Sequence, residues 1–426
     1  MAAGSPGCQP PAGTEPNRHG RDEAFGNSVM QEQAAQEVIA IGGRQEAEQK
    51  EIDQFETTVG VRLPADMRTV HNVRRWLNGW QGDAKKIQLL LRGYLLNRRA
   101  AALEDPNLIE HYQQNVHVRK VLPYIRMSTR PMVINEMDNT VVIVNQLGGI
   151  DYHRLPKVVS VRDLLMFYFV TAEYAMKQVL LQERRSGQTS GLTLIYDFGG
   201  FQVKDYLNPY SPIMQTFALG AKMMQDYYCD LLTGLYLLNT GAVVKTVLLL
   251  AKTVLVPRTL NKLHIIHGDN GIRNLLRSNV SANSLPLAFG GTWTESDPAV
   301  GASSCCTLCR PLAQAPHYKV KHLRNTSAVT LRPSNLHTKR IGIKKGQRLL
   351  WSFATTGKVE FSVYKSDSEN ESTLLVPRMV LCTPLGMAFP DQGNVTCEQT
   401  GEYAIEFRNV HSSFHVVKVH YSWAVE

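Results

Sequence analysis

The middle of the chain contains two kinds of hydrophobic segment, short runs typical of strands and longer stretches with helical spacing. Four short runs have the length and composition of buried strands: Thr140–Gln146, Leu192–Tyr196, Gly234–Leu238 and Leu263–Ile266. Three longer apolar stretches between them have helical spacing: Val161–Arg184, Ser211–Asp226 and Val243–Leu255. Strands and helices that alternate along a chain usually form a mainly parallel sheet covered by helices. The pattern therefore predicts an α/β domain here, and the long first helix, apolar on more than one face, is expected between two layers.

A basic helical segment precedes this region. Apolar residues recur at helical intervals from Leu63 to Ala102, with a break at Gly79–Asp83 where Asp83 can cap the second helix. We therefore expect a small helical module over residues 60–105. Residues 1–55 are rich in Pro, Gly, Gln and Glu and poor in aromatic side chains, which predicts a disordered tail.

The C-terminal part has a different texture. Residues 297–316 are rich in Ser, Ala, Pro and Cys and are expected to be a linker. Short alternating runs follow, at Arg348–Phe353, Val359–Tyr364, Leu374–Val380, Tyr403–Phe407 and Phe414–Trp423. They are separated by turn signals such as Thr356-Gly357, Asp391-Gln392-Gly393 and Thr400-Gly401. This pattern predicts a small antiparallel β-sandwich over residues 317–426.

One apolar segment, Leu231–Val256, is long enough to cross a membrane. Lys245 and Lys252 lie inside it, and each costs about 2.5–3.5 kcal/mol at a bilayer centre. We therefore predict a strand, a turn and a helix instead. The first residues lack the apolar run of a secretory signal, so a cytosolic location with reduced thiols is expected for the seven cysteines.

The net charge of +9, from 46 basic and 37 acidic residues, suits contact with an anionic surface better than nucleic-acid binding. Two basic clusters are candidates for a membrane or partner surface, with an ordinary solvated face as the alternative. The C-terminal cluster contains Lys339, Arg340, Lys344, Lys345 and Arg348. The N-terminal cluster contains Arg62, Arg68, Arg74, Arg75, Lys85, Lys86, Arg92, Arg98 and Arg99.

No complete catalytic set is present, and we expect no enzyme activity. His267-Gly268-Asp269 with Asn274 has the spacing of a phosphotransferase catalytic loop, but Asp197-Phe198-Gly199 precedes it instead of following it. No glycine-rich phosphate loop accompanies them, so a polar turn is the preferred interpretation.

A cysteine-rich stretch offers a second chemical alternative. Cys305, Cys306 and Cys309, with His317 and His322, could bind zinc, although the spacing is short and a flexible thiol-bearing linker is favoured. Whether these cysteines bind metal stays open, and no metal site is predicted.

Lys252 is a lone cation in an apolar stretch. If it is buried, an anionic group such as a phosphate or carboxylate should meet it; otherwise its ammonium group reaches the solvent. The sequence leaves both alternatives open.

Several motifs follow one another along the chain: Trp76-Leu77 to Arg99, Leu147-Gly148-Gly149-Ile150-Asp151, Leu194-Ile195-Tyr196-Asp197, Asp226-Tyr227-Tyr228, Leu237-Leu238-Asn239, Leu285-Pro286 and Phe289-Gly290-Gly291-Thr292. In this order they resemble the CRAL-TRIO family of lipid-binding and lipid-transfer proteins. The C-terminal part resembles the Golgi-dynamics (GOLD) β-sandwich of the supernatant-protein-factor, or tocopherol-associated, branch, through Gly393-Asn394-Val395-Thr396-Cys397, Gly401-Glu402-Tyr403, Phe407-Arg408-Asn409 and Ser412.

The resemblance implies a lipid pocket in residues 110–296, between a sheet and flanking helices, with a mobile gate near Thr253–Lys262. By position, Lys252 falls on a lysine that meets inositol phosphate in some members, and Asp230 on an acidic headgroup residue. Further lipid contacts are expected from Tyr196, Phe217, Tyr228, Leu238 and Leu255. Departures such as Tyr228-Cys229-Asp230 and Thr253 leave the lipid open between a phospholipid such as phosphatidylinositol and a tocopherol- or squalene-like ligand.

The expected function is therefore uptake of a lipid from membranes and its transfer, with no cofactor besides the bound lipid. The expected partners are that lipid, transiently an anionic membrane such as the Golgi or another endomembrane, and a protein partner of the GOLD domain, with no nucleic acid. The alternative is a lipid-sensing adaptor that recruits Golgi or vesicle partners through the GOLD domain without bulk transfer.

Overall fold

The computed structural model describes residues 42–202, 212–241, 244–266, 268, 277–294, 305–312, 323–366, 374–383, 390–410 and 414–426. The chain divides into two compact units, Met1–Thr57 and Thr58–Glu426. Residues 42–59 are helical, which differs from the expected disorder up to residue 55. Ile52, Phe55 and Val59 recur at helical spacing and are buried, so this segment has the apolar stripe that disordered tails lack.

The predicted helical module is present as α2 (Val70–Gly79) and α3 (Ala84–Ala100). The Asp83 side chain accepts a hydrogen bond from the Lys86 backbone N–H at 3.0 Å, so Asp83 is the expected N-cap. Short helices α4 (Leu108–His111) and α5 (Val116–Val121) follow and pack against the long central helix.

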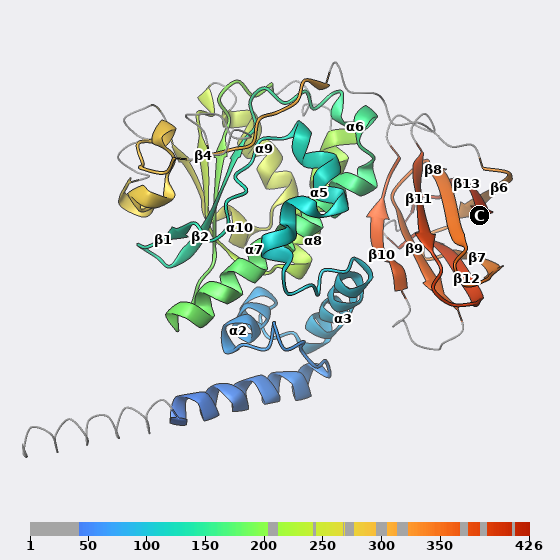
Figure 1. The fold of residues 1–426 in the computed structure, drawn as a ribbon, viewed down its shortest axis with the longest axis horizontal. Helices are drawn as coiled ribbons and strands as arrows, with labels where there is room; N and C mark the ends of the chain where they lie inside the picture. Colours follow the sequence, from blue (N-terminus) through green and yellow to red (C-terminus); the bar gives the residue numbers. More distant parts are fainter. Residues whose placement is uncertain are drawn as a thin grey trace, which may run out of the picture. The chain divides into compact units, whose positions relative to one another are not determined.

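The α/β prediction is confirmed by a five-stranded sheet in the order β1-β2-β3-β4-β5. Strands β2 (Thr140–Gln146), β3 (Leu192–Asp197), β4 (Leu232–Leu238) and β5 (Leu263–Ile266) are parallel, and the short β1 (Ile134–Asn135) is antiparallel to β2. Helices α8 (Pro212–Tyr227), α9 (Val244–Val254) and α10 (Pro257–Leu260) connect the later strands (Figure 1). The apolar stretch 231–256 is therefore a strand and a helix, as predicted.

The long helix α7 (Val161–Ser186) lies across β2 and β3 and also contacts α5 and α8 (Figure 1). Ser160 caps its start and Gly187, with a φ of 66°, ends it in the left-handed conformation. Within the described residues, α7 is long and apolar enough to cross a membrane, but 83% of its most apolar window is buried inside the protein. Its apolar character on several faces is thus that of a core helix between two layers.

The expected linker is in part a packed segment. Residues 305–312 lie along the α/β domain, where Cys306 forms a β-bridge with Ser128 and the Thr307 N–H donates to the Met127 carbonyl at 3.0 Å. Cys305 and Cys306 are buried among apolar side chains. The prediction of a flexible thiol-bearing linker is therefore wrong at these two residues, because their thiols behave as small hydrophobic groups.

The C-terminal region contains two antiparallel four-stranded sheets, as predicted for a β-sandwich. One has the order β10-β9-β12-β7 and the other β11-β8-β13-β6 (Figure 1). The strands are β6 (Asn325–Leu331), β7 (Leu336–Ile343), β8 (Arg348–Thr355), β9 (Val359–Lys365), β10 (Leu374–Leu381), β11 (Asp391–Thr396), β12 (Gly401–Arg408) and β13 (Val417–Val425). Phe353, Phe361 and Phe407 pack together in their core.

The expected turn Asp391-Gln392-Gly393 is instead the start of β11, paired with Phe353, Ser352 and Trp351 of β8. The Asp391 carboxylate accepts hydrogen bonds from Arg162 at the start of α7, at 2.9 and 2.8 Å. At Gly393 a Cβ atom would overlap the Trp351 ring. Asp391 is thus explained by its ion pair with Arg162, and Gly393 by its close contact with the Trp351 ring. The local sequence reveals neither contact.

A buried polar cluster connects α3 to α7. The Glu173 carboxylate of α7 accepts from the Arg98 Nε at 2.7 Å, the Tyr94 hydroxyl at 2.7 Å and the Tyr228 hydroxyl at 2.9 Å. Arg98 also pairs with Asp66. Burial and the Glu173 charge raise the pKa of both tyrosines well above its usual value, so that they stay protonated donors.

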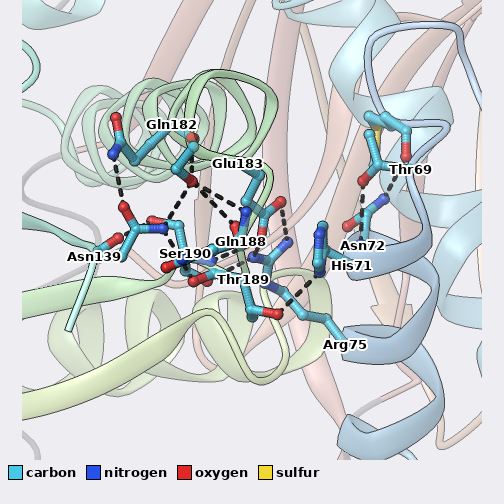
Figure 2. Close-up of polar contacts among 12 residues, drawn as sticks. Thr69, His71, Asn72, Arg75, Asn139, Gln182, Glu183, Gln188, Thr189 and Ser190 are labelled. Carbon is cyan, nitrogen blue, oxygen red and sulfur yellow. Dashed lines mark hydrogen bonds and ion pairs between the residues drawn. The ribbon is translucent and has the colours of Figure 1, made fainter. Parts of the chain in front are cut away.

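A second buried ion pair connects α2 to the C-terminal end of α7. Figure 2 shows Arg75 reaching Glu183, where it also donates to the Ser190 carbonyl at 2.8 Å. The Ser190 backbone N–H donates to Glu183 at 3.0 Å, so the same carboxylate also binds the backbone just before β3. Arg75 and Arg98 are therefore interior cations, and their assignment to a basic surface was wrong.

We expect Arg98→Met to lower the free energy of unfolding by about 3–5 kcal/mol, because it leaves Glu173 buried without its cation. Urea denaturation measures the loss. The neighbouring Arg99→Met is the control: Arg99 is exposed and lies 3.7 Å from Glu104, so its loss should cost less than about 1 kcal/mol. Equal losses in the two variants would contradict a special role for the buried cluster.

Candidate functional site

The two faces of the parallel sheet are covered differently. One face is sealed by the segment after β5, whose side chains Val280, Leu285, Phe289 and Trp293 pack on the strands together with Cys305 and Cys306. The strand residues on this face are also buried: Val142, Val144, Ile195, Tyr236, Leu238 and Ile266. This face is a closed core.

The opposite face is closed only in part. Phe198, Leu235 and Leu237 are buried there, but the apolar residues around them keep contact with solvent. These partly buried residues are Leu147, Leu194, Tyr196, Phe201, Leu232, Leu255, Leu263 and Ile265. We call this set, with the three buried residues, the open-face cluster. A sheet face that leaves so many large apolar side chains partly exposed is suited to a further apolar group.

The strand register creates this arrangement. Parallel pairing aligns Leu194 with Leu235, and Leu235 in turn with Leu263. The next aligned row contains Tyr196, Leu237 and Ile265. Because side chains alternate between faces with a period of two, both rows point to the same side. Helix α7 covers that side over β2 and β3, whereas α8 packs mainly on α7, α3 and α9.

Aromatic rings close one border of the open-face cluster. The Phe198 and Phe201 rings meet edge to face at 5.1 Å, and Tyr152 contacts Phe201 at 6.0 Å. At the same strand end, Asp197 accepts from the Gly199 N–H at 2.9 Å and from Asn239 at 2.8 Å. Asp197 therefore holds a turn, which gives the Asp-Phe-Gly string a structural role.

The two tyrosines in and beside the open-face cluster are uncharged. Burial raises the pKa of Tyr196, and burial followed by Tyr196 raises that of Tyr168 on the adjoining helix α7. Both hydroxyls therefore stay neutral at any physiological pH. An environment that disfavours charge is appropriate for an apolar ligand.

The structure brings together only some of the residues predicted to contact lipid. Tyr196 and Leu255 both belong to the open-face cluster. Leu238 is fully buried on the sealed face, and the Tyr228 hydroxyl is engaged by Glu173. Phe217, on α8, is 38% exposed. Leu238 and Tyr228 are therefore positioned as structural residues in this conformation.

The two predicted headgroup residues lie apart from these contacts. Lys252 is exposed on α9, so the solvent-reaching alternative describes its position. Asp230 has a φ of 57° and pairs at 2.7 Å with Lys262, which is the last residue of the segment expected to form the gate. Lys262 also donates to the Leu232 carbonyl at 2.6 Å, which fastens the end of that segment to β4.

The C-terminal basic cluster lies along β7 and just beyond it. Arg340 pairs with Glu402 at 2.9 Å, and the Lys339 ammonium lies 5.4 Å from the Trp423 ring centre. Lys344, Lys345 and Arg348 are exposed. The side chains of this cluster are therefore accessible, with Arg340 already paired.

Two chemical alternatives fall largely outside the described residues. His267, Asp269 and Asn274 are not among them, and neither are His317 and His322. In the described part, no group of three or more His, Cys, Asp and Glu side chains is placed to hold a metal ion. The Cys306 thiol donates to the Val144 carbonyl at 3.6 Å.

Sequence reasoning missed most of the open-face cluster. Leu194, Leu235, Leu237, Leu263 and Ile265 were assigned to strands but given no role. The signal was present, because alternate positions of neighbouring parallel strands must share a face. What the sequence lacks is the information that one face is sealed and the other is not.

Comparison with known proteins finds a family model that is similar to the α/β part of the chain. Residues 130–291 match the family model described as the CRAL/TRIO domain. This range covers the parallel sheet, α7 and the helices that follow it. The α/β part of the chain is therefore similar to the CRAL/TRIO domain, and the β-sandwich lies outside the matched range.

Three relatives are similar over different lengths. The CRAL-TRIO domain-containing protein C34C12.6 of Caenorhabditis elegans is 22% identical over 85% of this chain and 91% of its own. The phosphatidylinositol/phosphatidylcholine transfer protein SFH4 of Arabidopsis thaliana is 24% identical over 55% of this chain and 37% of its own. The Sec14 cytosolic factor of Schizosaccharomyces pombe is 27% identical over 42% of this chain and 60% of its own. The chain thus spans less than two thirds of the latter two relatives.

Adjacent residues of β3 test the difference between the two faces. Leu194→Trp adds volume on the open face and should leave the free energy of unfolding nearly unchanged. Ile195→Trp adds the same kind of side chain to the sealed core and should cost about 1–3 kcal/mol or more through overpacking. Urea denaturation of both variants measures this, and an equal cost would show that the open face has no spare room.

Proposed function

We propose that this protein binds a lipid at the open-face cluster and transfers it between membranes. The observation that carries the proposal is the contrast between a sealed sheet face and one whose large apolar residues stay partly exposed. Burying an acyl chain there would remove these residues from water, at roughly 0.8 kcal/mol per methylene. Because a lipid leaves an equally apolar bilayer, exchange is nearly neutral and its rate depends on access to the site.

The names of relatives support this class of ligand. One matched relative is named a phosphatidylinositol/phosphatidylcholine transfer protein. The proposed ligand is a phospholipid such as phosphatidylinositol, with a tocopherol- or squalene-like lipid as the other candidate. The proposed action is physical binding and release without covalent chemistry, and it needs no cofactor besides the lipid.

The proposed headgroup contacts are Lys252 and Asp230. Lys252 is an exposed cation on α9, close in sequence to Leu255 of the open-face cluster. Asp230 is 32% exposed beside Lys262, so a headgroup that reached it would share the ion pair. Movement of the segment Thr253–Lys262 would have to break that pair, so the pair is the proposed latch of the gate.

The proposed setting is the cytosol with transient visits to an anionic membrane of the Golgi or another endomembrane. One matched relative is named a cytosolic factor. The exposed lysines Lys344 and Lys345 supply one basic surface for such visits. We propose that the β-sandwich is a GOLD domain of the supernatant-protein-factor type, on the strength of its two antiparallel four-stranded sheets.

An adaptor is the second candidate, and the domain contacts favour it. The sandwich is held to the rest of its compact unit by the buried pair of Arg162 with Asp391 and by the partly buried hydrogen bonds of Asn97 with Arg378. A change at the lipid site could therefore alter a surface of the sandwich that a protein partner recognises. Stoichiometric bound lipid without exchange between donor and acceptor vesicles would favour the adaptor.

Mass spectrometry of lipids extracted from the detergent-free protein tests the proposal directly. We expect one lipid per chain, or uptake of one from vesicles when the protein is purified empty. Leu194→Trp should reduce the bound lipid while the protein stays folded. An empty protein that takes up no lipid from vesicles would refute lipid binding.

Lys252→Ala tests the proposed headgroup contact. If Lys252 meets a phosphate, its loss removes a charge-assisted hydrogen bond of about 1.5–3 kcal/mol, so uptake of phosphatidylinositol should weaken about tenfold or more. Uptake of fluorescent phosphatidylinositol from vesicles provides the measurement. Lys245→Ala is the matched control, since Lys245 is also exposed on α9. Equal effects of the two substitutions would reject a specific contact.

A further inference from the structure

One end of the β-sandwich presents apolar side chains to solvent. Leu336, at the start of β7, is 57% exposed, and Val410, just after β12, is 49% exposed. Before β13, Phe414 is 89% exposed and Val416 50% exposed. We call these four residues the apolar tip. Large apolar residues scattered singly are ordinary, but four at one end of a domain indicate an interaction surface.

The strand register places the apolar tip at one end. Leu336 pairs with Arg408 at the end of β12, and Val417 at the start of β13 pairs with Leu331 at the end of β6. The turn between β8 and β9 lies at the same end, because the Thr356 N–H donates to the Lys418 carbonyl at 3.0 Å. Several strand connections therefore meet there.

Asn409 holds these connections in place. Its buried side-chain amide donates to the Leu331 carbonyl at 3.1 Å and to the His415 carbonyl at 2.9 Å. Its backbone N–H donates to the Asn335 carbonyl, and its carbonyl accepts from the Ser334 N–H. The described backbone beside the apolar tip, from Leu331 to Asn335 and at Asn409 and His415, is thus joined by hydrogen bonds.

The exposed charged side chains around the apolar tip are basic. Arg332, Lys358 and Lys418 are exposed at this end. The sequence has no Asp or Glu from Leu331 to Arg348 or from Phe407 to Val425. On the strands, Glu360 of β9 lies opposite Arg408 at this end, is 19% exposed and lies 3.6 Å from Arg378. Glu406 and Asp391 are buried in ion pairs with Arg408 and Arg162. Exposed apolar groups within a basic border match an anionic bilayer, which offers acyl chains beneath negative headgroups.

We infer that the apolar tip inserts into the interfacial region of an anionic lipid bilayer, with Phe414 as its anchor. This inference rests on the proposed visits to membranes and assigns them to a defined surface. That surface differs from the Lys344 and Lys345 pair, which follows the opposite end of β7. Eight strand residues, about 24 Å, separate the two ends.

Flotation with phosphatidylcholine vesicles, with and without phosphatidylserine, tests the assignment. Phe414→Ser should lower the affinity for the anionic vesicles by about tenfold or more, because a large side chain no longer leaves water. The control is Leu89→Ser, which removes a residue on α3 that is 73% exposed and outside the apolar tip. Unchanged binding of Phe414→Ser, or equal losses in both variants, would overturn the inference.

A second measurement detects insertion itself. Phe414→Trp should show fluorescence quenching by brominated acyl chains beyond that of the five native tryptophans, whereas Leu89→Trp should not. Lys344→Ser combined with Lys345→Ser should weaken binding less than Phe414→Ser. The reverse order would assign the contact to the basic pair and overturn the role of the apolar tip.

Two further outcomes distinguish bilayer insertion from self-association and from lipid transfer. Self-association that Phe414→Ser abolishes, without vesicle binding by the unmodified protein, would make the apolar tip an interface between copies and overturn the bilayer assignment. Bound lipid is measured in the same samples by mass spectrometry. Loss of vesicle binding in Phe414→Ser with a normal content of bound lipid supports the inference. A protein that contains no lipid but still binds vesicles in a Phe414-dependent way would refute only lipid transfer.

Discussion

Glu173 sets the constraint on which the arrangement of helices depends. It is 1% exposed in the middle of the core helix α7, where an isolated carboxylate would be prohibitively costly. Its two oxygens are satisfied by Arg98 and Tyr94 of α3 and by Tyr228 just after α8. Burial alone would lower the pKa of Arg98, but Glu173 and Asp66 raise it above its usual value. The buried ion pair of Arg98 with Glu173 therefore depends on the positions of α3, α7 and the end of α8.

This requirement helps to explain why one sheet face can remain partly open. α8 is fixed at its end by Tyr228 and along α7, so it does not need to pack tightly on β4 and β5 to be held. The polar cluster thus supplies positional specificity that would otherwise come from apolar packing. A partly open apolar face can exist next to a well-ordered core because the polar cluster, and not apolar packing on that face, fixes the position of the helices.

The sequence predicted the elements well and their assembly poorly. The strands of the α/β domain, the cap at Asp83 and the long helix from Val161 followed from periodicity, which depends on neighbouring residues. Arg75, Arg98 and Asp391 were misplaced because local patterns cannot show a partner more than seventy residues away. Of the residues expected to contact lipid, Tyr196 and Leu255 lie in the open-face cluster, whereas Leu238 lies on the sealed face. A shift of one residue along a strand changes the face, and a motif alone does not define it.

The attachment of the β-sandwich follows from the same chemistry. β10 and β11 are edge strands of the two sheets, and an edge strand exposes backbone groups that must find partners. The Asn97 amide of α3 serves both backbone groups of Arg378 on β10, donating to the carbonyl at 3.0 Å and accepting from the N–H at 2.8 Å. The Asn97 amide also donates to the Tyr227 hydroxyl at 3.0 Å, at the end of α8. Because one side chain binds both the edge strand β10 and the end of α8, α8 cannot shift without disturbing how β10 is held.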